Sequence, residues 1–351
     1  MNSTSDLPLV SIVISNYNYA NFITQALDSA LTQTFTNIEI IVVDDGSKDN
    51  SKEVLQPYEG RVLMIFKENG GMASALNAGF ARAKGQLVMF LDADDILMPT
   101  TIATLVSLWK PGVSRVHFRL QCIDQHGNKL PSVLPRNTLA SGNLLDHLCT
   151  VGHYTSAPGS ANLYHRDLLD AVMPFKDPGS WRGFADGYLI FLSPIFGRIE
   201  AYQEPLGLYR VHQSSHTNIG TDAAAAVTKL RNDLKQDLLL RKTVEPVLEA
   251  HGRKLSAEAF TGSWKHMKHR FAACKLGGPG DPYPTDQLFT TARSFAGAVM
   301  GSSELSIKSK AEFLVWIALV TVLPAGMVKP IVFFGISTSY RDGLLQRLRV
   351  V

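Results

Sequence analysis

Short apolar runs with the character of buried strands alternate with helical patterns through the N-terminal part of this chain. The runs rich in β-branched residues lie at 9–15, 38–43, 62–66 and 87–91, and helical spacing follows at 22–31 and 72–80. Buried strands that alternate with helices pair in parallel and are covered by helices on both sides. The sequence therefore predicts an α/β fold with a parallel sheet.

Polar segments stand at the ends of three of these apolar runs. SNYN (15–18) follows the first run, DDGS (44–47) the second and DADD (92–95) the fourth. Ligands of open α/β sheets bind beyond the carboxyl ends of the strands. We therefore expect the three segments to meet at one edge of the sheet and to form the binding site.

The DADD segment places the carboxylates of Asp92, Asp94 and Asp95 directly after an apolar run. Two carboxylates about 4 Å apart repel each other by about 4 kcal/mol at an effective dielectric constant of about 20. A divalent cation such as Mg²⁺ or Mn²⁺, which binds carboxylate oxygens, would offset this repulsion. The alternative is an aspartate that caps a following helix, and the motif alone leaves both interpretations open.

The motifs occur together in an order that resembles a known enzyme family. SNYNYANF, VVDDGSKDNS, ENGGMASALNAGFARAKG and LDADD resemble the opening of family 2 glycosyltransferases with the GT-A fold, and the similarity extends from about residue 9 to about residue 216. The resemblance implies a GT-A type nucleotide-binding sheet flanked by helices over residues 1–216. The pattern of residues 217–351 predicts a helical C-terminal region.

The resemblance also implies a reaction. It is a metal-dependent, inverting transfer of a sugar from a nucleotide diphosphate sugar to a hydroxyl of a glycan or lipid-linked glycan, in polysaccharide or glycoconjugate synthesis. Such a single displacement needs one base opposite the leaving group and no enzyme nucleophile. The expected partners are the donor and the acceptor, with Mn²⁺ or Mg²⁺ as cofactor and no nucleic acid.

Within the DADD segment the resemblance implies a separate task for each acid. Asp94 is expected to bind the metal, Asp92 to lie against the ribose or the metal, and Asp95 to point toward the acceptor. LYRVHQSSHT (208–217) resembles the closing motif of the family, in which His212 is a further metal ligand, and a surface loop is the alternative. The bound metal would stabilise the leaving nucleotide diphosphate as a Lewis acid.

Further residues are expected along the nucleotide. The resemblance assigns Asp45 to the nucleotide base and Ser15 and Tyr17 to the facing wall. Gly71 would let the backbone approach the nucleotide closely, and Arg210 is expected to face the phosphates. The structural alternatives are a strand-to-helix turn at Asp45, a polar turn with a packed aromatic ring at Tyr17, and a helix start at Gly71.

The base that deprotonates the acceptor is expected in WRGFADGYLIFLSP (181–194). This segment resembles the catalytic segment of the family, in which a pair of acids is usual. Here the pair is Ala185 and Asp186, so the first acid is missing and Asp186 is assigned as the general base. The alternative for Asp186 is a helix N-cap.

Other nucleotide-binding classes fit this sequence less well. A sugar-nucleotide pyrophosphorylase, the alternative on a similar sheet, would need a Gly-rich basic loop after the first strand, and SNYNYANF has neither glycine nor a cation. A NAD-dependent enzyme would need GxGxxG and a P-loop enzyme GxxxxGK[ST], and neither motif occurs. A non-catalytic sugar-nucleotide or glycan-binding module on the same scaffold remains open.

Composition places the protein among folded chains with a reducing environment. Hydrophobic residues make up 45% and charged residues 19%, and the net charge is only +3. The cysteines Cys122, Cys149 and Cys274 are widely spaced, which argues against a disulfide framework or a zinc site. The first ten residues lack the pattern of a secretory signal. We therefore expect a cytoplasmic protein, or one on the inner face of the cell membrane.

An apolar run near the C-terminus has three interpretations. FLVWIALVTVLPA (313–325) is short for a membrane span, and Pro324 and Lys329 interrupt its continuation to Phe334. A membrane span, a helix pair lying on the membrane face and ordinary core are all open. Arg341, Arg347 and Arg349 follow in the tail and favour contact with a membrane surface.

Overall fold

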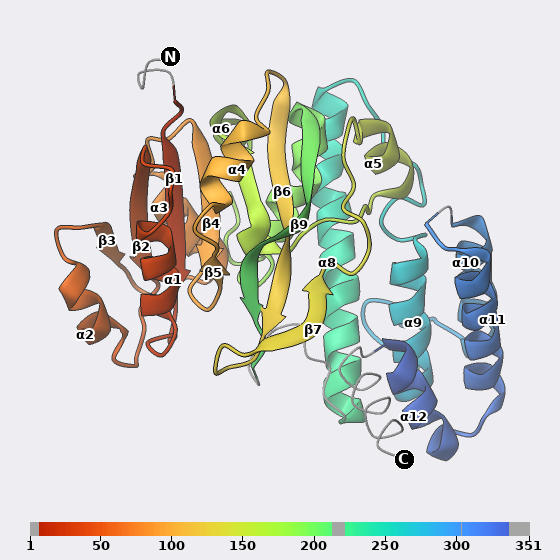
Figure 1. The fold of residues 1–351 in the computed structure, drawn as a ribbon. Helices are drawn as coiled ribbons and strands as arrows, with labels where there is room; N and C mark the ends of the chain where they lie inside the picture. Colours follow the sequence, from red (N-terminus) through yellow and green to blue (C-terminus); the bar gives the residue numbers. More distant parts are fainter. Residues whose placement is uncertain (1–6, 213–221, 303, 337–351) are drawn as a thin grey trace. The chain divides into compact units, whose positions relative to one another are not determined.

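The chain divides into two compact units (Figure 1). The computed structural model describes residues 7–212, 222–302 and 304–336. The first unit comprises residues 1–146 and 154–212, and the second comprises residues 147–153 and 213–351. Each unit is described by itself below.

Among the described residues, the first unit is built on one nine-stranded sheet with the order β3-β2-β1-β4-β8-β6-β9-β5 and with β7 paired to β6 (Figure 1). The strands are β1 (Val10–Asn16), β2 (Ile38–Asp44), β3 (Leu63–Phe66), β4 (Leu87–Asp92), β5 (Ile96–Leu97), β6 (Val113–Ile123), β7 (Lys129–Leu134), β8 (Asn162–His165) and β9 (Arg198–Arg210). Strands β1 to β4 are parallel, as predicted, but β8 is antiparallel to its neighbours β4 and β6. The parallel pairing predicted for these four strands is therefore confirmed, and the sheet becomes mixed beyond them, because the strand–helix alternation that produces parallel crossovers stops after β4.

The register of the parallel strands brings the three polar segments to one edge of the sheet. Asn16 at the end of β1 is paired with Asp44 at the end of β2. On the other side of β1, Ser15 is paired with Asp92 at the end of β4. The expected alignment of SNYN, DDGS and DADD is thus confirmed.

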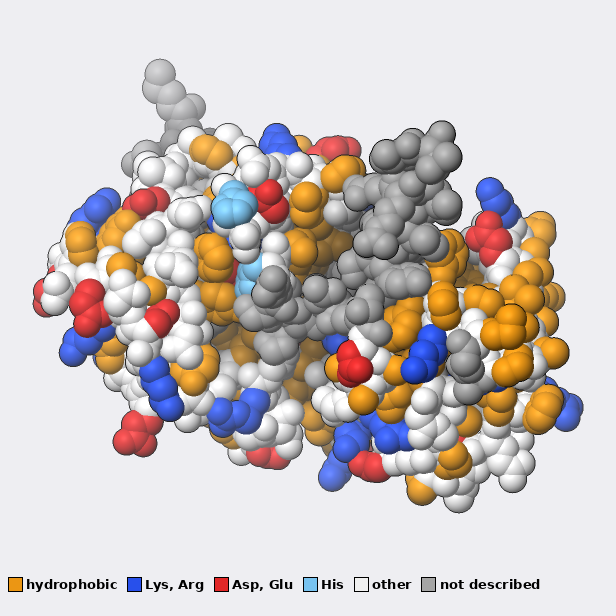
Figure 2. All heavy atoms as spheres, turned by 90° about the horizontal axis from the view of Figure 1, so that it is seen from below, with side chains coloured by type: hydrophobic (Ala, Val, Ile, Leu, Met, Phe, Trp, Pro, Cys, Tyr) orange, Lys and Arg blue, Asp and Glu red, His pale blue; other side chains and the backbone are white. Residues whose placement is uncertain are grey.

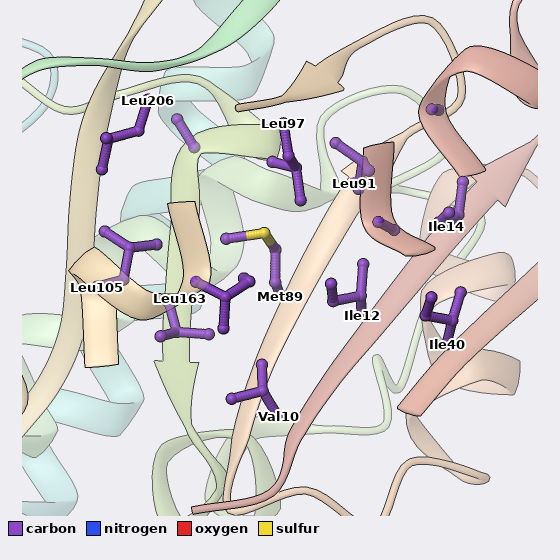
Figure 3. Close-up of a cluster of buried hydrophobic side chains, with 14 of the residues drawn as sticks. Val10, Ile12, Ile14, Ile40, Met89, Leu91, Leu97, Leu105, Leu163 and Leu206 are labelled. Atoms are coloured by element: carbon purple, nitrogen blue, oxygen red, sulfur yellow. The ribbon is translucent and has the colours of Figure 1, made fainter. Parts of the chain in front are cut away.

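Helices cover both faces of β1. The helices of the first unit are α1 (Ile23–Leu31), α2 (Ser51–Leu55), α3 (Met72–Phe80), α4 (Thr101–Ser107), α6 (Arg166–Val172) and α7 (Ala185–Phe196), and α5 (Leu145–Val151) leads into the second unit. On one face, Ile12 and Ile14 point into the hydrophobic cluster shown in Figure 3, together with Met89 of β4. On the other face, Val13 meets α3, and a Cβ atom added at Gly79 would lie 2.3 Å from Val13 Cγ1. Only glycine permits this approach of helix to strand.

The second unit is helical, as predicted for the C-terminal region. Its helices are α8 (Ala223–Ala250), α9 (Trp264–Gly277), α10 (Leu288–Gly301), α11 (Ile307–Val322) and α12 (Ala325–Ile336). Phe271, Phe295 and Trp316 form a cluster of rings in its core, with centroids 5.7 to 6.1 Å apart. The boundary predicted after residue 216 lies within 213–221, outside the described residues.

The apolar run at 313–334 forms most of α11 and α12. Trp316, Ile317 and Val320 of α11 and Val332 of α12 are buried in the core of the second unit. The core interpretation therefore holds for one side of each helix. Within the described residues, every helix is too short or too polar to cross a membrane.

Candidate active site

The acidic cluster occupies the connection between β4 and β5. Carboxylate oxygens of Asp92, Asp94 and Asp95 all lie within 4.8 Å of one another. The next helix, α4, begins later, and its N-cap residue is Thr100. The three acids are therefore not helix caps, and they form a compact set of oxygen ligands of the kind that hard divalent cations bind.

Mutual repulsion and burial make this cluster electrostatically unfavourable by itself. Burial, followed by the charges of Asp94 and Asp186, raises the pKa of Asp92 to about 7. Burial and the charges of Asp94 and Asp92 also hold the pKa of Asp95 well above its usual range. A divalent cation would relieve this repulsion, so both the oxygen donors and their charge fit Mg²⁺ or Mn²⁺.

His212 lies against the acidic cluster, although many residues separate the two in the sequence. Its Nε2 is 2.9 Å from Oδ2 of Asp94, and its side chain is only 6% exposed. The imidazole stacks on Phe22 and meets the edge of Tyr19, with ring centroids 5.5 and 5.6 Å away. The surface-loop alternative for His212 is therefore wrong, and the two residues predicted as metal ligands are brought together.

Arg210, the last residue of β9, is 1% exposed. Its backbone N–H donates to Oδ1 of Asp95, its Nε donates to the backbone oxygen of Asp94, and its Nη2 donates to Oε1 of Gln25 in α1. These hydrogen bonds fix the position of the connection that carries Asp94 and Asp95. The role of Arg210 toward phosphate stays a prediction, and its contacts here are those of a structural anchor.

Asp186 lies in the first turn of α7, after the N-cap residue Phe184. The structural alternative, in which Asp186 is the helix N-cap, is therefore wrong. A small cavity of about 20 Å³ is lined by residues that include Asp92, Asp186 and Gly159. The charge of Asp186 contributes to the raised pKa of Asp92, which agrees with the two carboxylates facing the same cavity. Residues far apart in sequence thus form one acidic site.

Asp45 is the centre of a second, differently built contact. One carboxylate oxygen is 2.6 Å from Nζ of Lys67, and the carboxylate also accepts the backbone N–H groups of Gly70 and Gly71 at 3.0 and 2.7 Å. Gly71 has a φ of +84°, a conformation that favours glycine. Asp45 therefore ties the 67–71 loop to the end of β2, and its contact with a nucleotide base stays a prediction.

Ser15 and Tyr17 lie at the same edge of the sheet. Ser15 is paired with Val43 on one side and with Asp92 on the other. Tyr17 follows the end of β1 and is 41% exposed, so its ring is open to a ligand rather than packed as the structural alternative proposed. Their contacts with a nucleotide stay predictions.

Two residues that the sequence did not single out contact this site. Burial and the charges of Asp94, Asp92 and Asp95 raise the pKa of Tyr19, so its hydroxyl stays protonated next to the acids. Its place in SNYNYAN was a signal that could have been used.

Arg182 is the second of these residues. Its backbone oxygen accepts the N–H of Met72 at 2.9 Å, and its Nη2 donates to Oδ1 of Asn69. A Cβ atom at Gly71 would come within 2.8 Å of the Arg182 side chain. The segment that carries Asp186 therefore packs on the glycine loop held by Asp45, and no local sequence pattern indicates this contact.

Comparison with known proteins identifies the family. The profile of glycosyl transferase family 2 matches residues 11–172. An uncharacterized glycosyltransferase of Nostoc sp. is 34% identical over 245 residues, which cover 66% of this chain and 76% of that protein. This chain belongs to glycosyltransferase family 2. The protein is therefore a glycosyltransferase, and the resemblance inferred from its motifs is confirmed.

Other relatives match shorter parts of this glycosyltransferase. An uncharacterized glycosyltransferase of Rickettsia prowazekii is 41% identical over 131 residues, or 36% of this chain and 41% of that protein. Chondroitin synthase of Pasteurella multocida is 46% identical over 99 residues, or 27% of this chain and 10% of that protein. The chain thus spans less than half the length of these two relatives.

A solved structure agrees with the fold. The mannosyltransferase PcManGT from Pyrobaculum calidifontis, in complex with GDP-Man and Mn²⁺, has a TM-score of 0.50 and 17% sequence identity to this glycosyltransferase, and the match covers 93% of this chain and 84% of that chain. At this identity the likeness shows the fold alone. The predicted GT-A type sheet flanked by helices is confirmed.

Proposed function

We propose that this glycosyltransferase transfers a sugar from a nucleotide diphosphate sugar to a hydroxyl of a glycan or lipid-linked glycan, with inversion and with Mn²⁺ or Mg²⁺ as cofactor. The observation that carries the proposal is the cluster of Asp92, Asp94 and Asp95, with His212 at 2.9 Å from Asp94. A negative cluster repels a diphosphate, but a dication held by these carboxylates would supply the positive charge that attracts one.

The residues that would hold the metal are Asp94 and His212, with Asp92 alongside. When bound, the metal supplies Lewis-acid stabilisation of the negative charge on the departing nucleotide diphosphate. Arg210 fixes the positions of Asp94 and Asp95 through its hydrogen bonds. Because these bonds pre-order the ligands, binding requires little rearrangement of the acidic connection.

On the acceptor side, Asp186 would take the proton of the attacking hydroxyl on a carboxylate oxygen. Its place in the first turn of α7, with Asp92 facing the same small cavity, supports a position between donor and acceptor. One such base, opposite the leaving group, is what a single inverting displacement requires.

The donor would lie along the carboxyl ends of β1, β2 and β4. Ser15, Tyr17 and Asp45 would contact its nucleoside, and the backbone at Gly71 would approach it closely. The exposed ring of Tyr17 supports a stacking contact with the base. That the mannosyltransferase of similar fold was solved with GDP-Man and Mn²⁺ agrees with a nucleotide sugar and a dication here.

The acceptor and location are proposed on the same basis. Relatives named chondroitin synthase and hyaluronan synthase support a role in polysaccharide or glycoconjugate synthesis. We place the protein in the cytoplasm, with the second unit in contact with the inner face of the cell membrane.

A donor screen tests this function. The melting temperature of the full chain is measured with UDP-, GDP- and dTDP-sugars, each with Mn²⁺ and with EDTA. We expect one nucleotide class to raise the melting temperature in the presence of Mn²⁺ and to have little effect with EDTA, because binding of a ligand to the native state stabilises it. Equal shifts with Mn²⁺ and with EDTA would contradict the metal-dependent site.

A further inference from the structure

The C-terminal half of α11 is apolar around its whole circumference. Residues 313–322 contain one polar side chain, that of Thr321. Trp316, Ile317 and Val320 point into the core of the second unit and are 8%, 7% and 0% exposed. A helix that is apolar on all sides is normally buried on all sides. Here one side is buried and the opposite side is not.

The open side of this helix carries a row of exposed hydrophobic side chains. Leu314, Val315, Leu319 and Val322 are 37%, 60%, 44% and 81% exposed, and their spacing places them on one face, here called the α11 apolar face. Figure 2 shows hydrophobic side chains gathered over this part of the second unit. Single exposed hydrophobic residues are common, but a continuous row indicates a surface that contacts an apolar partner.

The polar groups next to the α11 apolar face are already paired. Nε1 of Trp316 donates to the backbone oxygen of Ile331 at 2.7 Å, and Oγ1 of Thr321 donates to that of Ile317 at 2.7 Å. At the end of α11, Nζ of Lys275 donates to the backbone oxygen of Leu323 at 2.8 Å. These groups therefore need no water, which suits contact with a hydrocarbon phase, where unpaired polar groups are costly.

Cations accompany the apolar surface. Lys308 precedes it on α11, and Lys329 lies on α12; both are exposed. From residue 288 to 336 the charged residues are Arg293, Lys308, Lys310 and Lys329 against Glu304 and Glu312. Two copies of this surface would bring like charges together, whereas a negatively charged lipid surface complements them.

We propose that the α11 apolar face docks on an anionic lipid bilayer, with its side chains at the boundary of the acyl chains and the nearby lysines at the headgroups. The inference deepens the membrane location proposed above, and rests on it, by naming the surface that makes the contact. The other side of α11 stays in the core of the second unit, so the helix would lie along the membrane surface. Met327 and Phe334 of α12 are also exposed, at 65% and 39%.

Vesicle cosedimentation of the full chain tests the proposal with two variants that place opposite charges at the same position of the α11 apolar face. Vesicles of phosphatidylcholine with phosphatidylglycerol are used at low salt, with Val315→Glu and Val315→Lys as variants. We expect both variants to lower the partition coefficient about tenfold, because either charge opposes burial of this position in an apolar phase. Leu7→Glu, a similar change at an exposed residue of the first unit, should bind like the wild type. If Val315→Lys binds more tightly than the wild type, the contact is only electrostatic and the proposal is overturned.

Two further measurements separate this inference from its competitors. A stable dimer in sedimentation equilibrium that Val315→Glu dissociates, with no vesicle binding by the wild type, would assign the face to a second copy and overturn the proposal. Donor binding, measured by the melting shift in the same samples, reports on the proposed function separately: intact donor binding without vesicle binding overturns only the membrane contact. Surface substitutions are preferred to deletion of α11 and α12, because deletion would remove Trp316 and Val332 from the core.

Discussion

Buried aspartates have opposite electrostatic surroundings in the two units. In the first unit, Asp92, Asp94 and Asp95 face one another, and burial and mutual repulsion raise the pKa values of Asp92 and Asp95. In the second unit, Asp237 lies between two histidines, with carboxylate oxygens 3.2 Å from Nε2 of His153 and 2.7 Å from Nδ1 of His266.

This difference separates a site built for a ligand from a structural network. Although burial opposes it, His153 and His266 hold the pKa of Asp237 below its usual range, so its charge is satisfied within the fold. Asp286 is similarly paired with the guanidinium of Arg270. Acids that are paired inside the protein contribute to stability, whereas acids gathered against each other repel, and a bound cation would offset that repulsion.

The largest expected effect comes from removing one charge from the acidic cluster. Asp94→Asn should lower the transfer rate about 10³–10⁴-fold, because several kcal/mol of charge stabilisation at the leaving group are lost. Donor binding should no longer respond to Mn²⁺ while circular dichroism stays that of the wild type. Asp167→Asn, at a side chain that is 88% exposed, is the matched control. Unchanged Mn²⁺-dependent donor binding in Asp94→Asn would remove Asp94 from the site.

Asp186→Asn should separate proton transfer from donor binding. We expect the transfer rate to fall about 10³-fold, since the acceptor hydroxyl loses its base, while the affinity for the donor stays near that of the wild type. Steady-state transfer assays and donor titrations measure the two effects. Wild-type turnover in this variant would mean that another group takes the proton.

In the second unit the same kind of substitution should change stability instead of activity. Asp237→Asn removes the charge between His153 and His266 and should lower the free energy of unfolding by about 2–4 kcal/mol. Donor affinity should be unchanged. Asp281→Asn, which breaks a pair with Lys235 at a carboxylate that is 75% exposed, should cost less than about 1 kcal/mol. Equal melting temperatures for Asp237→Asn and the wild type would show that the contacts of Asp237 with His153 and His266 do not stabilise the fold.

The last expected effect is a pH dependence of the second unit. Burial, followed by the charge of Lys268, lowers the pKa of His269 to about 3, and the charged or titratable groups that act on it are Lys229, Asp233, Asp237, His266 and Lys268. The unfolded histidine binds a proton below about pH 6.5, but the folded one does not until about pH 3. Protonation of His269 therefore does not affect the free energy of unfolding above about pH 6.5. As the pH falls below this value, the free energy of unfolding decreases by up to about 1.4 kcal/mol per pH unit.

His269→Gln tests this slope. Melting curves between about pH 4 and pH 7 should depend less on pH in the variant than in the wild type. His251→Gln, an exposed histidine at the end of α8, is the matched control and should leave the slope unchanged. An identical slope in all three proteins would contradict the assignment to His269.

Much of the first unit could be predicted because short stretches of its sequence indicate the strands by themselves. The apolar runs gave the bounds of β1, β2 and β4 to within a residue, and their pairing then brought Asn16, Asp44 and Asp92 to one edge. The approach of His212 to Asp94 was anticipated only through the resemblance of whole motifs to a family.

What could not be predicted depends on contacts between distant segments. The antiparallel course of β8 is one case, because no local pattern sets the direction of a strand that follows a long loop. The donors that reach the Asp45 carboxylate are another, since an aspartate at a strand end does not reveal which loop will offer N–H groups. The exposure of Val315 is a third, because an apolar helix sequence does not show which side will be covered.

The course of residues 147–153 limits how the two units can be exchanged between proteins. This segment lies between two stretches of the first unit in the sequence but belongs to the second unit, where the N–H of Phe260 donates to the backbone oxygen of Val151 at 2.9 Å and the N–H of Ser256 donates to the backbone oxygen of Cys149 at 2.8 Å. A fragment ending at His212 would keep this segment but lose Ser256 and Phe260, which hydrogen-bond to it. A C-terminal region from another protein would have to pack on a segment that does not match it. Recombination at a single point cannot transfer the second unit intact, so the two units are expected to be inherited, and engineered, as a pair.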